Sequence, residues 1–156
     1  MSSLDDLYKE IILDHYRSPR NQGELAPPAH RCEGFNALCG DEIIVYVSLI
    51  DEKIEDIKIG GQGCSISQAS ASMMTEIIKG KSVTEAEEII HAFKEMMDIY
   101  ESELSGKEAV SSTSAIDLGD LEALQGVVKY PVRIKCATLA WNTLTQSIDE
   151  IQGLDD

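Results

Sequence analysis

Two neighbouring β-type segments constrain the fold of this chain more than any other feature. Residues 42–50 (EIIVYVSLI) are apolar and β-branched, and residues 54–60 (IEDIKIG) alternate apolar and polar side chains. The three residues between them, 51–53, are short enough for a hairpin turn, which makes the two strands antiparallel. A further strand at about 31–36 is expected to pair across a sharp turn at 39–41. The sequence therefore predicts a small antiparallel sheet of about three strands.

Segments with helical periodicity lie on both sides of this region. The predicted helices cover residues 4–16, residues 67–79, a stretch from Thr84 to about Tyr100 that begins with a Thr84–Glu87 capping box, and a final helix introduced by Pro131. The first half of the second helix consists of small residues, so we expect that end to be buried. This order of elements predicts an α+β fold in which helices pack on one face of a small antiparallel sheet.

The chain length of 156 residues suits one domain. No internal repeat or linker divides it, so residues 1–156 are predicted to form a single domain. Residues 101–119 are polar and serine-rich, and we expect a mobile insertion there, followed by a short helical turn at 120–124.

The charge balance disfavours whole classes of partner. Thirteen Lys and Arg against 28 Asp and Glu give a net charge of −15, which repels phosphate backbones and anionic lipids. No run approaches the ~18 apolar residues that span a bilayer, and the first ten residues lack the features of a signal peptide. We therefore expect no nucleic acid or membrane partner and a cytoplasmic location. Three basic residues, Lys129, Arg133 and Lys135, nevertheless cluster directly before Cys136.

Three cysteines stand at places where a thiolate is favoured or well exposed to a ligand. Cys39 and Asp41 flank a glycine that permits a tight turn. Cys64 follows a glycine-rich segment where a strand passes into a helix, and Cys136 opens the last helix beside Arg133 and Lys135; dipole and cations favour the thiolate there. Three thiolates and one carboxylate make a complete tetrahedral zinc site. Taken one at a time, Cys39 and Cys64 are better explained by chance spacing or a tight turn with a buried thiol, and Cys136 is as compatible with a core position as with a reactive thiolate.

The remaining reactive side chains are predicted to be structural. Cys32 lies in the first predicted strand and is interpreted as a packing residue or spare thiol. The histidines (His15, His30 and His91) lack metal-ligand spacing and are interpreted as ordinary surface residues, and the Met73-Met74 and Met96-Met97 pairs as core residues. No phosphate-binding loop, serine triad or dinucleotide fingerprint is present.

Three sequence blocks resemble the signature blocks of the IscU/NifU N-terminal family of iron–sulfur cluster assembly proteins. They are Asn36-Ala37-Leu38-Cys39-Gly40-Asp41, Gly63-Cys64-Ser65-Ile66-Ser67 and the stretch from Pro131 to Trp141 (PVRIKCATLAW). The chain is most similar to the SufU-type branch of Gram-positive bacteria. Scaffold members carry His immediately before the last Cys, whereas this chain has Lys135, and the serine-rich stretch fits the insertion of that branch. Residues 129–133 (KYPVR) keep the chaperone-binding segment of scaffold members only in part.

The resemblance implies a zinc site formed by Cys39, Asp41, Cys64 and Cys136, and a SufS-type cysteine desulfurase as partner. It further implies that the partner supplies a histidine to zinc and displaces Cys39, which then accepts sulfur as a persulfide. Such a protein is a sulfurtransferase-type carrier that works with the desulfurase and is not a stand-alone enzyme. Its sulfur passes on to a downstream SUF scaffold or to apo iron–sulfur proteins. Arg133 is expected to orient Asp41 or to contact the partner.

Two other functions remain open at this point. The same residues are compatible with a scaffold that binds iron or a [2Fe–2S] cluster and transfers the cluster to apo-proteins. They are also compatible with an acidic binding module whose zinc only braces the fold.

Overall fold

The computed structural model describes residues 3–37, 40–104 and 118–153. Its elements in chain order are α1 (Ser3–Arg17), β1 (His30–Asn36), β2 (Asp41–Ile50), β3 (Lys53–Gln62), α2 (Ser65–Ile78), α3 (Val83–Leu104), the 3₁₀ helix η1 (Gly119–Lys129) and α4 (Pro131–Gly153). The predicted α+β class is confirmed, and each predicted strand and helix has a counterpart.

The strands form one antiparallel sheet in the order β1-β2-β3. Ile50 pairs with Lys53, which leaves a two-residue loop between β2 and β3. Both loop residues, Asp51 and Glu52, have positive φ values (53° and 60°), as the tight turns that match the strand twist require. On the other side of β2, Asn36 pairs with Asp41, so the β1–β2 connection brings the Asn36–Asp41 block to one end of the sheet.

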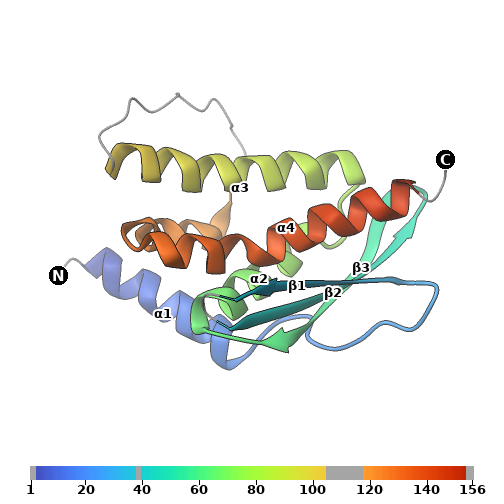
Figure 1. Ribbon diagram of the computed structural model, residues 1–156, viewed down its shortest axis with the longest axis horizontal. Helices are drawn as coiled ribbons and strands as arrows, with labels where there is room; N and C mark the ends of the chain where they lie inside the picture. The colour runs from blue at the N-terminus through green and yellow to red at the C-terminus, as the bar shows by residue number, and fades with distance from the viewer. Residues whose placement is uncertain (1–2, 38–39, 105–117, 154–156) are drawn as a thin grey trace.

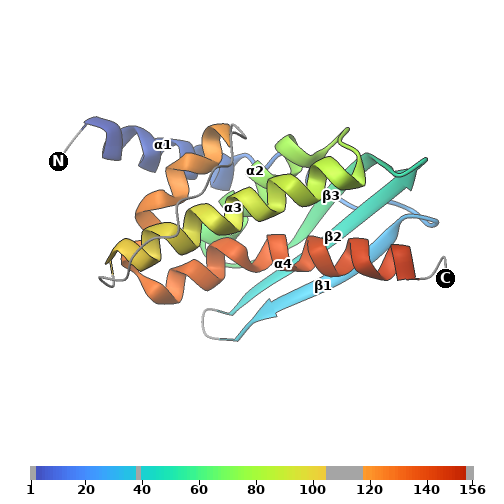
Figure 2. The same ribbon diagram turned by 90° about the horizontal axis from the view of Figure 1, so that it is seen from above.

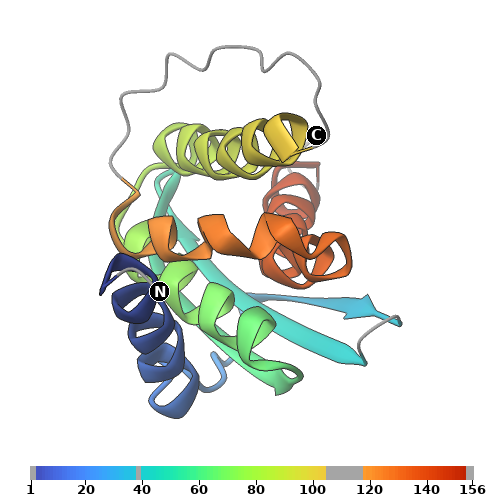
Figure 3. The same ribbon diagram turned by 90° about the vertical axis from the view of Figure 1, so that its left-hand side faces the viewer.

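The helices pack in layers on the sheet (Figure 1). α4 runs along β1 and β2, and α2 lies against β2 and β3 (Figure 2). α3 covers the opposite side of α4 from the sheet, as the view from the end of the molecule shows (Figure 3). Phe93 of α3 stacks on Trp141 of α4 with ring centroids 4.4 Å apart, which joins the two helical layers.

Close approach between elements depends on small residues, as the sequence predicts for α2. Ala69, Ser70 and Ala71 are completely buried, and the indole N–H of Trp141 donates a hydrogen bond to Ser70 Oγ at 3.0 Å. Ser70 in turn donates to the Ala137 carbonyl, so α2 and α4 are joined by a buried polar chain within an apolar interface. At Gly34 of β1, a Cβ atom would overlap the Thr143 side chain of α4.

Three local predictions are wrong in detail. The capping box of α3 is formed by Ser82 and Glu85, not by Thr84 and Glu87. Ser82 N–H donates to Glu85 Oε1 (3.2 Å) and Glu85 N–H donates to Ser82 Oγ (3.1 Å). The helix begins earlier because Val83 N–H is bound by the Glu52 carbonyl of the hairpin loop, a contact that sequence periodicity does not reveal.

The second correction concerns the first bound of the predicted insertion and the turn after it, and the third concerns His15; the insertion itself stays a prediction. Residues 101–104 belong to α3, η1 extends well beyond the predicted short turn, and residues 105–117 lie outside the described part of the chain. His15 is 1% exposed and is not a surface residue, because α2 and η1 cover its side of α1. His91 is exposed, as expected, and the buried Met73, Met74 and Met97 confirm the core assignment of the methionines.

Candidate metal centre

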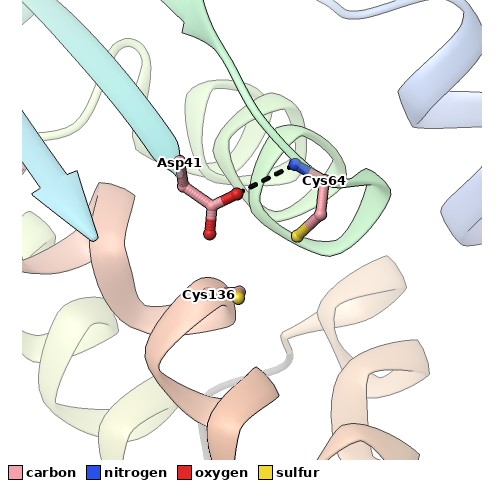
Figure 4. Close-up of side chains that lie close together, drawn as sticks. All are labelled: Asp41, Cys64 and Cys136. Atoms are coloured by element: carbon pink, nitrogen blue, oxygen red, sulfur yellow. Dashed lines mark hydrogen bonds between the residues drawn. The ribbon is translucent and has the colours of Figure 1, made fainter. Parts of the chain in front are cut away.

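Asp41, Cys64 and Cys136 come from three separate parts of the sequence and meet at one point (Figure 4). A carboxylate oxygen of Asp41 and the two sulfurs all lie within 4.8 Å of one another. Asp41 is the first residue of β2, Cys64 lies between β3 and α2, and Cys136 lies in α4. The fold thus brings together three of the four residues that the sequence singled out as candidate ligands.

Cys64 is held at the N-terminus of α2. It is the N-cap residue, with an extended backbone, and its sulfur accepts a hydrogen bond from the Ser67 backbone N–H at 3.5 Å. The sulfur thus occupies the place of a side-chain cap at the start of the helix. The prediction of a thiol at a strand-to-helix junction is therefore confirmed.

The glycine before Cys64 is required by the close approach of Asp41. A Cβ atom at Gly63 would lie 2.5 Å from Asp41 Oδ1 and 2.7 Å from Ser67 Oγ. Because glycine has no Cβ atom, Asp41 can lie close enough for Cys64 N–H to donate to Asp41 Oδ1 at 2.9 Å. The Gly63-Cys64 pair therefore positions the carboxylate as well as the thiol.

Asp41 is completely buried yet held in its ionised form. Burial by itself raises the pKa of the carboxyl group. Hydrogen bonds outweigh that effect and lower the pKa below its usual value; they come from the backbone of Cys64 and from the side chains of Cys136, Cys64 and Ser67. A buried anionic carboxylate beside two thiols is a preformed set of ligands for a cation.

Cys136 is completely buried, but it does not open its helix. α4 begins at Pro131, so Cys136 is in the second turn, where the helix dipole contributes less than the sequence analysis assumed. Its sulfur is approached instead by the side chain of Asn36, whose Nδ2 donates to it at 3.6 Å and lies 3.5 Å from Asp41 Oδ2. The sequence analysis missed Asn36 as a site residue, although it begins the first signature block.

Arg133 supplies a positive charge to the two thiols from the exposed side of α4. Attraction to the Cys64 thiolate, with hydrogen bonds to Cys136 and Cys64, raises the pKa of the Arg133 guanidinium above its usual value. These contacts are with the two thiols, and the expected roles of Arg133, orienting Asp41 or contacting a partner, stay predictions. Lys135, immediately before Cys136, is exposed.

The remaining two cysteines are Cys39 and Cys32. Cys39 lies outside the described residues. Cys32 is 5% exposed in the middle of β1, opposite Val45 of β2, and burial raises the pKa of its thiol. It packs in the sheet, as predicted, and is not part of the cluster.

The donor set fits zinc. Two thiolates and a carboxylate oxygen are ligands that Zn²⁺ takes in tetrahedral sites. None of the described cysteines is in a disulfide.

Comparison with known proteins gives the family. The description "NifU-like N terminal domain" matches residues 7–138, which is most of the chain. The chain belongs to this family. It is 46% identical over 152 residues to the zinc-dependent sulfurtransferase SufU of Bacillus subtilis, covering 97% of this chain and 96% of that protein. It is also 40% identical over 148 residues to the iron–sulfur cluster assembly scaffold protein IscU of Streptococcus pyogenes, covering 95% of this chain and 86% of that one.

Solved structures agree with the fold. A chain from Fervidobacterium islandicum, described as a candidate SUF-system scaffold protein, is 36% identical and superposes with a TM-score of 0.70, covering 94% of this chain and 98% of that one. A NifU-like N-terminal domain from Brucella abortus, at 22% identity, shares the fold with a TM-score of 0.71, covering 97% and 99%. No described helix is both long enough and apolar enough to cross a membrane.

Proposed function

We propose that this protein is a zinc-dependent sulfur acceptor of iron–sulfur cluster assembly that takes sulfur from a cysteine desulfurase. The observation that carries this proposal is the buried cluster of Asp41, Cys64 and Cys136, with Arg133 beside the two sulfurs. The similarity over almost the whole chain to a zinc-dependent sulfurtransferase supports it.

Four residues of this chain would hold the zinc ion: Cys39, Asp41, Cys64 and Cys136. Cys39 is two residues from Asp41, so chain connectivity keeps its Cα within roughly 7 Å of the Asp41 Cα. Zinc bound there would keep the thiols deprotonated at neutral pH while masking them from other electrophiles. Asp41 is a harder ligand than a thiolate, which separates this site from a closed four-thiolate site.

Cys39 is the proposed sulfur acceptor. Its thiolate attacks the outer sulfur of the persulfide on the desulfurase, a new S–S bond forms on Cys39, and the S–S bond of the desulfurase breaks. The desulfurase cysteine leaves as a thiolate, so the transfer needs no external oxidant or reductant. The Arg133 guanidinium lies where it can stabilise negative charge on the neighbouring sulfurs. A downstream SUF scaffold or an apo iron–sulfur protein would then receive the sulfur.

Intact-protein mass spectrometry tests this proposal directly. The zinc-loaded protein is incubated with a cognate cysteine desulfurase and cysteine, and the modified residue is mapped. We expect one added sulfur on Cys39 that a reductant removes, and none in Cys39→Ala. Cys32→Ala is the matched control, because Cys32 is a buried cysteine of the sheet outside the cluster and its loss should leave the added sulfur in place. No added sulfur in the presence of an active desulfurase would refute the acceptor role.

A second candidate function is a scaffold for a [2Fe–2S] cluster, which would be its cargo. The similarity to the Streptococcus pyogenes scaffold protein favours it, and three cysteines with one carboxylate are a donor set that can release a cluster. Anaerobic reconstitution with iron and sulfide, followed by transfer to an apo-ferredoxin, distinguishes the two. A stable visible-absorbing cluster that is transferred supports the scaffold; failure to form one supports the sulfur acceptor.

A further inference from the structure

A second group of metal-ligand side chains lies away from the cysteines, between α1, α2 and η1. His15 of α1 is 1% exposed, and its Nδ1 is 2.8 Å from Ser72 Oγ of α2. The same hydroxyl oxygen accepts the Arg20 backbone N–H at 2.9 Å, which fixes the Ser72 side chain. A hydrogen bond at Nδ1 orients the imidazole and directs Nε2 at a fixed point, as happens for metal-binding histidines.

The carboxylates of Asp120 and Glu76 both lie near the Nε2 atom of His15. Nε2 of His15 is 3.3 Å from Asp120 Oδ2 of η1 and 3.6 Å from Glu76 Oε1 of α2. The three ligand atoms all lie within 4.8 Å of one another. Two carboxylates held this close repel each other unless a positive charge lies between them.

The distances at His15 differ from those of the other two histidines. His30 Nε2 is 2.8 Å from Glu150 and His91 Nε2 is 2.7 Å from Glu95, which are ordinary hydrogen-bond lengths. The separations at His15 are longer, although the 3.3 Å contact with Asp120 is also a hydrogen bond, and they are close to the edge of a tetrahedral metal site, about 3.4 Å between a nitrogen and an oxygen ligand.

The surroundings give an ion access from solvent. The side chains of Glu76 and Asp120 are 49% and 59% exposed, and both line a surface hollow of about 340 Å³ between α2 and η1. The nearby Arg20 guanidinium is attracted to both the Glu76 and Asp120 carboxylates. Its Nη2 atom is paired with Asp14 Oδ2 at 2.6 Å. The site thus has a buried, oriented nitrogen on one side and open positions for water on the other.

We propose that His15, Glu76 and Asp120 form a second divalent-metal site, separate from the cysteines, that takes a first-row ion such as Zn²⁺. One imidazole and two carboxylates suit zinc and its neighbours better than Mg²⁺ or Ca²⁺, which prefer oxygen ligands alone. The ion clamps α1 and η1 onto α2 (Figure 3). Because Cys64 caps α2 and η1 leads into the helix of Cys136, the same ion steadies the elements that carry two of the cysteines.

The test counts metal ions on the intact protein. Zinc-loaded protein is brought to equilibrium by dialysis against free Zn²⁺, and bound zinc is measured by elemental analysis alongside the thermal unfolding midpoint. We expect two ions per chain in the unmodified protein and one in Glu76→Gln and in Asp120→Asn. These two carboxylates are exposed, so the variants should fold. Ser72→Ala should weaken the second ion by about 10–100-fold, since the imidazole loses its orienting partner.

The matched control is Glu95→Gln, which removes the carboxylate beside His91 and should retain two ions. The unfolding midpoint of the unmodified protein should rise with added zinc beyond the first equivalent, and that of Asp120→Asn should not. A single zinc in the unmodified protein overturns the proposal. A second zinc that survives both carboxylate variants overturns it equally.

Discussion

Gly63→Ala is the most direct probe of how tightly the cysteine cluster is packed. The added Cβ atom would lie 2.5 Å from Asp41 Oδ1, 2.7 Å from Ser67 Oγ and 3.1 Å from the Asp41 Cα atom. The last of these is backbone, so the clash cannot be relieved by a side-chain rotation alone. The Asp41 carboxylate must move, and it loses the hydrogen bond from Cys64 N–H.

The cost has two parts. Overpacking of a close contact costs about 1–3 kcal/mol, and loss of a hydrogen bond to a buried charged group costs about 1.5–3 kcal/mol. Since both follow from the same displacement, we expect a total of about 2–4 kcal/mol. With a urea slope of about 2 kcal/mol/M, the unfolding midpoint of the metal-free protein falls by about 1–2 M. Displacement of the carboxylate should also lower zinc affinity by about 10–100-fold.

The assay pairs urea unfolding of the metal-free protein with zinc competition against a chromophoric chelator. Gly126→Ala is the matched control, because no atom lies within 4 Å of a Cβ atom placed at Gly126. It should leave both measurements nearly unchanged. If Gly63→Ala behaves like this control, the close packing of Asp41 against the Gly63-Cys64 backbone is refuted. If it loses stability but keeps its zinc affinity, Asp41 is not a zinc ligand.

Four further predictions concern the frame around the site. Gly34→Ala should destabilise the protein by about 1–3 kcal/mol, because the new Cβ overlaps the Thr143 side chain, and Thr143→Ala in the same chain should recover part of the loss in thermal unfolding. Trp141→Phe should cost about 1–3 kcal/mol in urea unfolding, since it removes a buried hydrogen bond and shrinks a completely buried side chain. Ser82→Ala should cost about 0.5–2 kcal/mol by removing the cap of α3. Hydrogen bonds from Ser82 lower the pKa of Glu85 below its ordinary value of 4.5, so its contribution to stability is present above that pH and is lost as the pH falls; Glu85→Gln should flatten this part of the pH–stability profile.

These predictions have their own controls. Thr84→Ala removes the residue that the sequence pattern favoured as the cap, and it should be nearly neutral if Ser82 is the cap. An equal loss in both variants would contradict the cap assignment. A Gly34→Ala, Thr143→Ala double variant no more stable than Gly34→Ala alone would show that the strain lies elsewhere than at the contact between α4 and β1.

Local patterns in the sequence were sufficient for the elements and for most of the candidate site. Two apolar, β-branched segments separated by the short turn at 51–53 predicted an antiparallel hairpin, and the structure has it with a loop one residue shorter. The small residues of α2 indicated a buried helix, because only small side chains allow another backbone so close. The signature blocks marked Asp41, Cys64 and Cys136, since each sits where a strand or helix begins or has just begun.

Those local patterns did not predict contacts between distant segments of the chain. His15 follows Ile11 by four residues and therefore lies on the apolar face of α1, but its residue type led the sequence analysis to place it on the surface. Its partners Ser72 and Asp120 are 57 and 105 residues away, and no local pattern indicates them. Asn36 reaches Cys136 across 100 residues. The cap of α3 begins at Ser82 because the hairpin loop of the sheet binds the next residue.

One physical reason explains why the sequence predicted local elements and did not predict contacts between distant segments. Backbone propensity, side-chain size and the periodicity of apolar residues act within a few residues, so the sequence by itself determines which segments become strands and helices and which thiols stand at their ends. The partner that satisfies a buried polar group is chosen only when separate elements pack together. The tertiary structure therefore decided that Asp41 is ionised beside two thiols, and that His15 faces two carboxylates on neighbouring helices.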